Sequence, residues 1–417
     1  MHLYHDSQRL LCRSPLGAAP CGARVRLRLR AGEPIQSALL RFYDGSEKWI
    51  PMEKEQDGWY AAVAVMPEIP ILCWYDFRVA DMDGHVIAYG GPADGMGGEG
   101  LETDCPRAWQ ITVYDPGYET PAFMREGVMY QIFPDRFYRS GAAHPRREEI
   151  VYHEDWQDTP LLIPEGEDDN CARDFFGGDL QGIREKLPYL QALGVTVLYL
   201  NPVFMARSNH RYDTADYTRI DPLLGDNGDF AALCRDAKAA GIRVVLDGVF
   251  SHTGEDSVYF NRLGRFPVVG ACQSTQSPYY PWYTFTRYPD EYKCWWNFHT
   301  LPEVNKTDPG YQAFILGKDG VARSWVRQGS AGWRLDVADE LPMDFLRKLR
   351  AAVKAENPDA LVLGEVWEDA SHKVAYGEMR CYCQGDTLDS VMNYPLRAAA
   401  IDFFTGRADA FALCRLI

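Results

Sequence analysis

Gly332 to Glu340 read GWRLDVADE, and this stretch decides the fold. It is a short apolar run that leads into charged residues. Two other segments are built the same way, VVLDGVFSH from Val244 to His252 and LVLGEVWED from Leu361 to Asp369. Helical patterns separate the three along the chain, and buried strands that alternate with helices predict βα units and a parallel sheet.

The same alternation extends on both sides of these segments, from residue 128 onward. We expect strands at residues 128–133, 195–200, 242–247, 332–336, 361–365 and 388–392, and helices at 180–193, 230–240, 311–328, 341–355 and from 396. This predicts an α/β fold, a (β/α)8 TIM-type barrel that is truncated after about six strands, because the chain stops at Ile417. Residues 253–309 are too long and too rich in Tyr, Trp and Pro for a plain loop, so we expect a small subdomain inserted after the third strand.

The first 120 residues differ from this pattern and are β-rich. Arg24 to Arg30, RVRLRLR, alternates strictly, as a half-buried antiparallel strand does. Further strands are expected at residues 37–43, 59–66 and 74–80, and Asp83-Gly84 is a hairpin turn signal. We therefore predict an N-terminal β-sandwich over residues 1–120 and a barrel domain over 121–417, joined near Tyr114 to Pro121.

The composition excludes some classes of partner. A net charge of −16 disfavours nucleic acid and anionic membranes, which are polyanions, and suits a neutral ligand. Aromatic residues make up 13% of the chain and suit flat sugar faces, although a large core also uses them. The 11 cysteines lack zinc-type spacing, so we expect free thiols. Neither a signal sequence nor a membrane-length apolar stretch is seen, so we expect a cytoplasmic location.

The polar ends of the three opening segments predict an active site. Arg334 and Asp336 share one strand face, and Glu365 ends the next strand on the equivalent face, which in a parallel barrel is the interior. Neighbouring strands lie about 4.8 Å apart, so equal heights would bring the Asp336 and Glu365 carboxylates to about 5 Å, which suits a retaining glycosidase. Arg334 can hold Asp336 ionised, whereas Glu365 lacks such a partner in its own segment, so its pKa could be raised as a general acid requires. Any one of these carboxylates alone could equally belong to a structural ion pair.

These three segments resemble the first three conserved motifs of the α-amylase family of glycoside hydrolases. Supporting segments resemble its branch of neopullulanases, cyclomaltodextrinases and maltogenic amylases: VMYQIFPDRF (Val128 to Phe137), FFGGDLQGI (Phe175 to Ile183), HRYDTADY (His210 to Tyr217), WWNFHTLPEVN (Trp295 to Asn305) and MNYP (Met392 to Pro395). The match follows the family's order, and the N-terminal part resembles that branch's sandwich more weakly. The resemblance implies a retaining hydrolase of α-1,4-glucans such as maltooligosaccharides, cyclodextrins and pullulan.

The resemblance also implies roles for eight residues. Asp336 is the nucleophile, Glu365 the acid and base, and Arg334 positions Asp336. The residues that match those around the sugar on the non-reducing side of the scissile bond are His210, Tyr212, Asp247 and His252. Trp296 matches an aromatic wall on the leaving-group side; the alternative is a core tryptophan of the inserted subdomain.

Three departures from the family's pattern change what we expect. Ser251 stands where the first motif usually has Asn. The branch's loop calcium is placed in doubt, because Tyr138 to Arg147, YRSGAAHPRR, offers neither Asn nor Asp, although Gly178 and Asp179 persist. The fourth motif, with the third catalytic carboxylate, has no match after Met392, so we expect little hydrolysis by these 417 residues alone.

Other readings stay open. We expect no cofactor for the chemistry, with a structural calcium as the alternative. An oligo-α-glucosidase is the nearest alternative function, and a non-catalytic glucan-binding protein with a degenerate barrel is the more distant one. The branch resemblance also implies a homodimer that the N-terminal sandwich helps to form.

Overall fold

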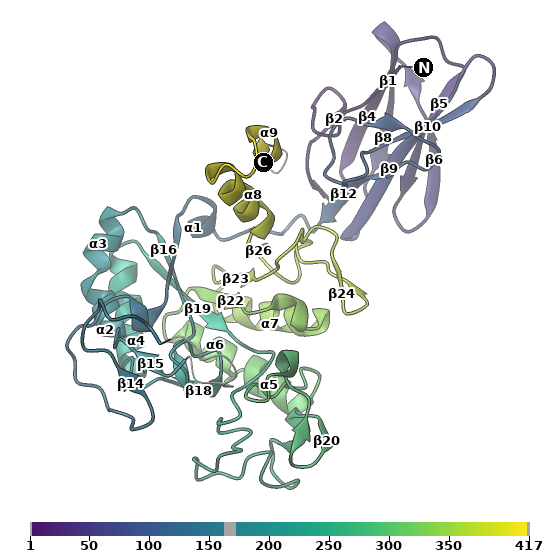
Figure 1. Ribbon diagram of the computed structural model, residues 1–417. Coiled ribbons are helices and arrows are strands. Elements are labelled where there is room, and N and C mark those ends of the chain that lie inside the picture. The colour runs from purple at the N-terminus through teal and green to yellow at the C-terminus, as the bar shows by residue number, and fades with distance from the viewer. Residues whose placement is uncertain (1, 162–171, 415–417) are drawn as a thin grey trace. The chain divides into compact units, whose positions relative to one another are not determined.

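The computed structural model describes residues 2–161 and 172–414, which group into two units. One unit contains Met1–Glu119, Trp367–Asp386 and Asn393–Ile417, and the other contains Thr120–Val366 and Thr387–Met392. Figure 1 traces the chain through both. Whether residues 1–120 and 121–417 are separate domains remains a prediction.

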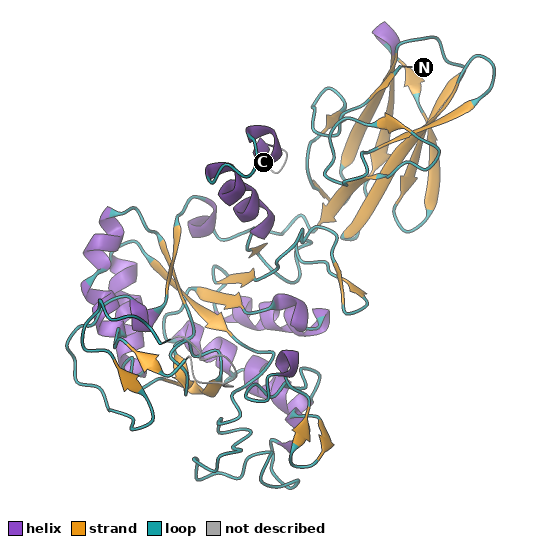
Figure 2. Ribbon diagram, in the orientation of Figure 1, coloured by secondary structure: helices purple, strands orange, loops and turns teal. Residues whose placement is uncertain are grey.

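Two β-sheets form the N-terminal part (Figure 2). The five-stranded sheet contains β1 (Leu3–Tyr4), β2 (Arg13–Ser14), β4 (Arg24–Ala31), β7 (Glu53–Lys54) and β8 (Trp59–Val65). The seven-stranded sheet contains β3 (Ala19–Pro20), β5 (Ser37–Tyr43), β6 (Glu47–Pro51), β9 (Ile71–Ala80), β10 (Val86–Gly90), β11 (Leu101–Glu102) and β12 (Trp109–Tyr114).

The alternation in β4 explains how these sheets pack. Val25, Leu27 and Leu29 are completely buried, whereas the arginines between them lie on the outer face. The buried face belongs to one core that also contains Phe77 and Ile111 from the other sheet. This confirms the expected half-buried strand and explains why the two sheets stack face to face.

The same unit also holds elements from later in the chain, which the sequence did not place there. They are the hairpin of β24 (Val374–Ala375) and β25 (Glu378–Met379) and the helices α8 (Tyr394–Phe404) and α9 (Ala410–Cys414).

A six-stranded parallel sheet forms the centre of the other unit, as predicted. Its strands follow chain order, β13 (Met129–Ile132), β16 (Val197–Leu200), β19 (Arg243–Gly248), β22 (Gly332–Leu335), β23 (Leu361–Gly364) and β26 (Ser390–Val391). Each pair of neighbours is parallel. Sequential parallel pairing is the arrangement of a TIM barrel, of which this sheet is the six-stranded part.

The inner face of this sheet changes from apolar to polar along the strands. Val245, Leu361 and Leu363 contribute to one buried cluster at the strands' beginnings. On the other face of β22, Trp333 is buried and donates its indole N–H to the Ala322 carbonyl 3.0 Å away on a flanking helix. The sheet therefore has apolar packing on both faces until its strands end, and polar side chains collect there.

Helices connect the strands, and two of the expected helices are broken. The helix expected at 180–193 is α2 (Leu180–Glu185) followed by α3 (Leu187–Ala192), because Pro188 has no N–H to continue the helical hydrogen bonds. The helix expected at 311–328 is α5 (Pro309–Leu316) and α6 (Val321–Arg327), separated by Gly317 and Gly320. The remaining helices are α1 (Ala122–Arg125), α4 (Asn227–Ala239) and α7 (Met343–Glu356).

Short hairpins and turns fill the longer connections. Between β16 and α4 the chain forms the hairpin of β17 (Phe204–Ala206) and β18 (Thr214–Ile220), which the sequence analysis missed. The expected insertion at 253–309 contains η3 (Tyr280–Trp282), β20 (Phe285–Arg287), β21 (Glu291–Tyr292) and η4 (Trp295–Asn297), and β14 (Val151–Tyr152) pairs with β15 (Asp174–Phe175) before α2. Within residues 2–161 and 172–414, none of the helices has the length and apolar character needed to cross a bilayer.

Candidate active site

Strand register brings the three predicted catalytic side chains and the predicted substrate-binding Asp247 to one level of the sheet. In the pairing of β19 with β22, Asp247 lies opposite Arg334. In the pairing of β22 with β23, Leu335 lies opposite Gly364, so Asp336 and Glu365 are the next residues on each strand. The carboxyl ends of three successive parallel strands therefore present these four side chains together, as the sequence predicted.

Arg334 binds all three acidic side chains. Its Nη1 lies 2.9 Å from Asp247 Oδ1 and 2.9 Å from Asp336 Oδ1, and its Nη2 lies 2.8 Å from Glu365 Oε1. All four residues are buried, with at most 8% of any of them exposed. We call Asp247, Asp336 and Glu365 the carboxylate cluster. The segment of Glu365 contains no basic partner, as expected, and in the folded chain Arg334 of the neighbouring strand supplies one.

The carboxylate cluster has more potential negative charge than Arg334 can neutralise. Burial, followed by the nearby Asp247, raises the pKa of Asp336 to about 8, although Arg334 acts in the opposite direction. Burial also raises the pKa of Asp247 against the effect of Arg334. Burial and the neighbouring carboxylate therefore favour the protonated forms of Asp336 and Asp247 more than in water.

The backbone beside Asp336 is strained. Val337 has φ 37° and ψ 61°, a left-handed conformation that β-branched residues rarely adopt. Its N–H donates to Glu365 Oε2 at 2.9 Å. This donor could not be predicted from the sequence, because valine disfavours the left-handed conformation. Strain of this kind is found where a site holds a side chain in place.

Two tyrosines extend the cluster. Tyr212 donates its hydroxyl to Asp247 Oδ2 at 3.1 Å, and the Tyr199 hydroxyl donates to the same oxygen. The sequence analysis named Tyr212 but missed Tyr199. The sequence contained a signal for Tyr199. Side chains two residues apart on a strand share a face, so Tyr199 follows Val197 on the inner face of the sheet as Asp247 follows Val245. The predicted His210 is packed beside Tyr212, with ring centroids 5.8 Å apart.

His252 packs against the aromatic residues of η4. The His252 ring is buried and lies 5.2 Å from the Trp295 ring, while its Nδ1 is 2.9 Å from the Ser251 hydroxyl. Burial lowers the pKa of His252 to about 3, so the ring is neutral. Trp296 stacks on Trp295 with centroids 5.4 Å apart and is 59% exposed. This exposure excludes the alternative that Trp296 is a core residue.

Trp296 contacts the segment that contains Asp336. Its indole Nε1 lies 3.4 Å from Glu340 Oε1, four residues after Asp336 in the chain. The backbone of Trp296 has a positive φ of 47°, as does the following Asn297 with 63°. An exposed ring in this position can stack against the apolar C–H face of a sugar ring.

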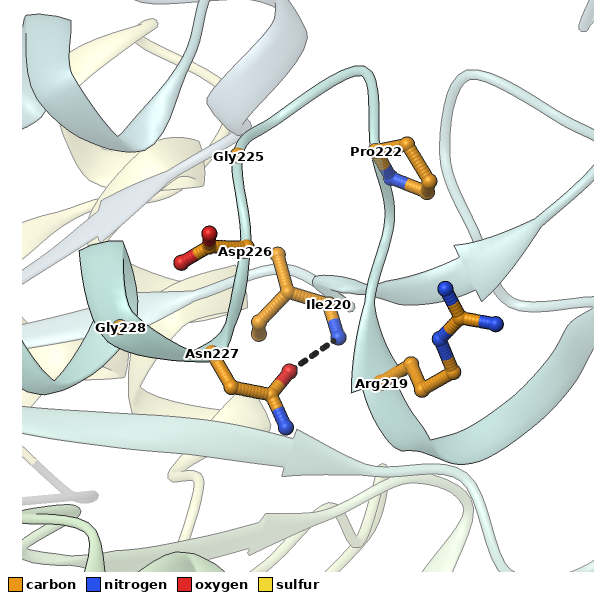
Figure 3. A pocket seen from close by; sticks show the side chains of 7 residues that line it. All are labelled: Arg219, Ile220, Pro222, Gly225, Asp226, Asn227 and Gly228. Atoms are coloured by element: carbon orange, nitrogen blue, oxygen red, sulfur yellow. Dashed lines mark hydrogen bonds between the residues drawn. The ribbon is translucent and has the colours of Figure 1, made fainter.

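A separate surface pocket lies at the start of α4 and contains none of the eight predicted residues (Figure 3). Its shape follows from local structure, since Asn227 accepts a hydrogen bond of 2.9 Å from the Ile220 N–H across it. The pocket is lined by Arg219, Ile220, Pro222, Gly225, Asp226, Asn227 and Gly228.

Comparisons with known proteins show which family this chain is similar to. The family model described as the α-amylase catalytic domain matches residues 131–416. Amylopullulanase of Thermoanaerobacterium saccharolyticum is 37% identical over 97% of this chain, and neopullulanase 2 of Thermoactinomyces vulgaris is 37% identical over 70%. This chain spans 34% of the first relative's length and 46% of the second's.

A solved structure similar to this one contains a glucan ligand. It is the cyclic α-maltosyl-(1→6)-maltose hydrolase of Arthrobacter globiformis in complex with cyclic α-maltosyl-(1→6)-maltose. The likeness has a TM-score of 0.60 and 34% sequence identity, and it covers 72% of this chain and 62% of that one.

Proposed function

Because this chain belongs to the α-amylase family of glycoside hydrolases, we propose that it cleaves α-1,4-linked glucans with retention of configuration. The substrates are maltooligosaccharides and cyclodextrins, and pullulan is a further candidate. The observation that carries the proposal is the Arg334-centred cluster, in which Asp247, Asp336 and Glu365 meet at the ends of three adjacent parallel strands.

In the first step, the Asp336 carboxylate attacks the anomeric carbon. A β-linked glycosyl ester forms, the bond from that carbon to the glycosidic oxygen breaks, and the oxygen takes the proton of the Glu365 carboxyl group. Arg334 supports the ionised form of Asp336 through the 2.9 Å ion pair. The surplus negative charge of the cluster also favours the cationic transition state of this reaction.

In the second step, water replaces the ester. Glu365, now ionised, accepts a proton from the water, whose oxygen bonds to the anomeric carbon and releases Asp336. Arg334 Nη2 and the Val337 N–H hold the two oxygens of Glu365 at 2.8 and 2.9 Å, which keeps this carboxylate oriented between steps.

The remaining predicted residues bind the sugar. Tyr212 offers its ring to the sugar on the non-reducing side of the scissile bond, and Asp247, His210 and His252 offer hydrogen bonds to its hydroxyl groups. The neutral state of His252 allows its ring nitrogens to act as one donor and one acceptor. Trp296 supplies a stacking surface on the leaving-group side, which its exposure makes accessible.

Product analysis tests this proposal. The chain is incubated with β-cyclodextrin, pullulan and maltotriose, and products are separated by chromatography; the Asp336→Asn variant is the control. Because these 417 residues contain no match to the motif with the third catalytic carboxylate, we expect only slow formation of maltooligosaccharides from cyclodextrin. The variant should form none, and the α-anomer should appear first by NMR. Release of glucose alone from maltotriose would favour an oligo-α-glucosidase. Binding of glucan without products, equal in both proteins, would favour a non-catalytic binding protein.

A further inference from the structure

The segment after β13 is where the branch resemblance implies a calcium ion, and its acceptor groups are already occupied by protein donors. Asp179 is completely buried at the start of α2. Its Oδ1 accepts from the Gly182 N–H at 2.5 Å. Its Oδ2 lies 2.7 Å from the Ser140 hydroxyl and 3.0 Å from His144 Nε2. Both oxygens of this carboxylate therefore face hydrogen-bond donors.

Arg139 occupies a second set of acceptors. Its Nε and Nη2 donate to the Phe176 carbonyl at 2.9 and 2.6 Å, and Nη2 also donates to the His153 carbonyl at 2.5 Å. Nη1 also donates to the Glu154 carbonyl at 3.4 Å, so four hydrogen bonds of the guanidinium group join the backbone before α2 to the residues that follow β14. Gly177 allows this approach, since a Cβ there would lie 3.2 Å from Arg139 Nε.

His144 links two further points. Its Nε2 contacts Asp179, and its Nδ1 lies 3.2 Å from the Pro222 carbonyl in the connection between β18 and α4. The side chains of Arg139 and His144 therefore connect residues 138–147 to three separate parts of the chain. A metal ion with several oxygen ligands would make the same kind of connection.

These residues do not fit a calcium ion. Calcium takes about six to eight oxygen ligands, whereas the residues here present N–H groups and a fixed positive charge to the available oxygens. Within residues 2–161 and 172–414, one group of three or more acidic, His or Cys side chains converges closely enough to hold a metal ion. It consists of Asp81, Asp83 and His85 on the β9–β10 hairpin, and Asp179 is not part of it.

We propose that Arg139 and His144 take the place of a structural metal in this chain, so that residues 138–147 are anchored without calcium. The positive guanidinium and the imidazole ring satisfy the carboxylate and carbonyl oxygens that a cation would otherwise bind. Asp179 is consequently not a calcium ligand in this protein.

Thermal unfolding of the full chain tests the proposal. Wild type is melted in about 5 mM calcium, which exceeds the range of the weakest protein sites, and in excess EGTA. We expect the same Tm in both. Arg139→Met should lower the Tm by about 4 °C or more, because it leaves the carbonyls of Phe176 and His153 without these donors. Arg146→Met is the matched control, since Arg146 is a surface residue of the same segment paired with an exposed Glu154, and it should change the Tm by about 1 °C or less.

Two results would overturn the proposal. One is a saturable rise of the wild-type Tm with calcium that Asp179→Asn abolishes and Asp81→Asn does not. The other is an Arg139→Met protein as stable as Arg146→Met. Should Arg139→Met fail to fold, calcium binding to wild type by isothermal titration still decides the question, because a site at Asp179 requires heat of binding that Asp179→Asn removes.

Discussion

Replacing Arg334 by methionine removes the cation that all members of the carboxylate cluster share, while keeping a side chain of similar length. The three contacts of 2.8 to 2.9 Å place opposite charges about 4 Å apart between group centres. At an effective permittivity near 20, each pair is worth about 4 kcal/mol before desolvation is counted. The desolvation of Arg334 offsets much of that sum, and breaking a buried pair costs about 3–5 kcal/mol in practice. We therefore expect Arg334→Met to lose about 4 kcal/mol of unfolding free energy at pH 8.

The loss should depend on pH. Burial and Asp247 already raise the pKa of Asp336 to about 8, and removal of Arg334 raises it further. A carboxyl group whose pKa is higher in the folded than in the unfolded state destabilises the fold increasingly as pH rises above the unfolded value. At pH 5 the cluster can take up protons, so the loss should fall to about 2 kcal/mol.

Urea denaturation followed by tryptophan fluorescence at pH 5 and pH 8 measures both values. Arg184→Met is the matched control, because Arg184 pairs with Asp236 at the surface, where the two side chains are 27% and 35% exposed. It should lose about 1 kcal/mol or less at either pH. A loss of less than about 1 kcal/mol for Arg334→Met, or an equal loss at the two pH values, would refute the electrostatic reasoning.

Three further predictions concern other parts of the chain. Burial lowers the pKa of His5 to about 4. The free energy of unfolding should therefore fall by about 3 kcal/mol as the pH drops from about 6.5 to 4. Denaturation of the His5→Gln variant should show a smaller fall over the same pH range. Gly332→Ala should lower the free energy of unfolding by about 3 kcal/mol or more, because the new Cβ would lie 2.1 Å from the Leu361 carbonyl oxygen. Gly194→Ala is the control: its Cβ would have nothing within 4 Å, so it should lose only about 1–2 kcal/mol because of its positive φ. Urea denaturation compares the two variants. Light scattering should detect a dimer, and a monomer at all concentrations would contradict that expectation.

Much of the site could be predicted because it depends on strand order and alternation. Asp336 and Glu365 each follow a four-residue strand, and parallel pairing then brings them to one level. Counting along the strands also places Asp247 at this end of the sheet. The sequence alone carried this information because the period of a strand is fixed by its backbone geometry.

Contacts made through side-chain reach could not be predicted in the same way. Arg334 was expected to serve Asp336, its neighbour in the strand, but its fork also reaches Asp247 and Glu365 on two other strands. The left-handed Val337 contradicts its own conformational preference, so no propensity argument finds it. The two helix breaks could have been predicted. Pro188 and the pair Gly317 and Gly320 indicate helix ends, but the apolar spacing around them favoured continuous helices.

The central claim, that Asp336 is the nucleophile of a retaining glycosidase, is tested most directly by trapping the glycosyl ester. The protein is incubated with 5-fluoro-α-maltosyl fluoride, whose fluoride leaves without a proton from the acid, and is then digested for peptide mass spectrometry. We predict one adduct, on Asp336, in wild type and in Glu365→Gln, and none in Asp336→Asn. An adduct on another residue, or no adduct in wild type at saturating reagent, would contradict the account.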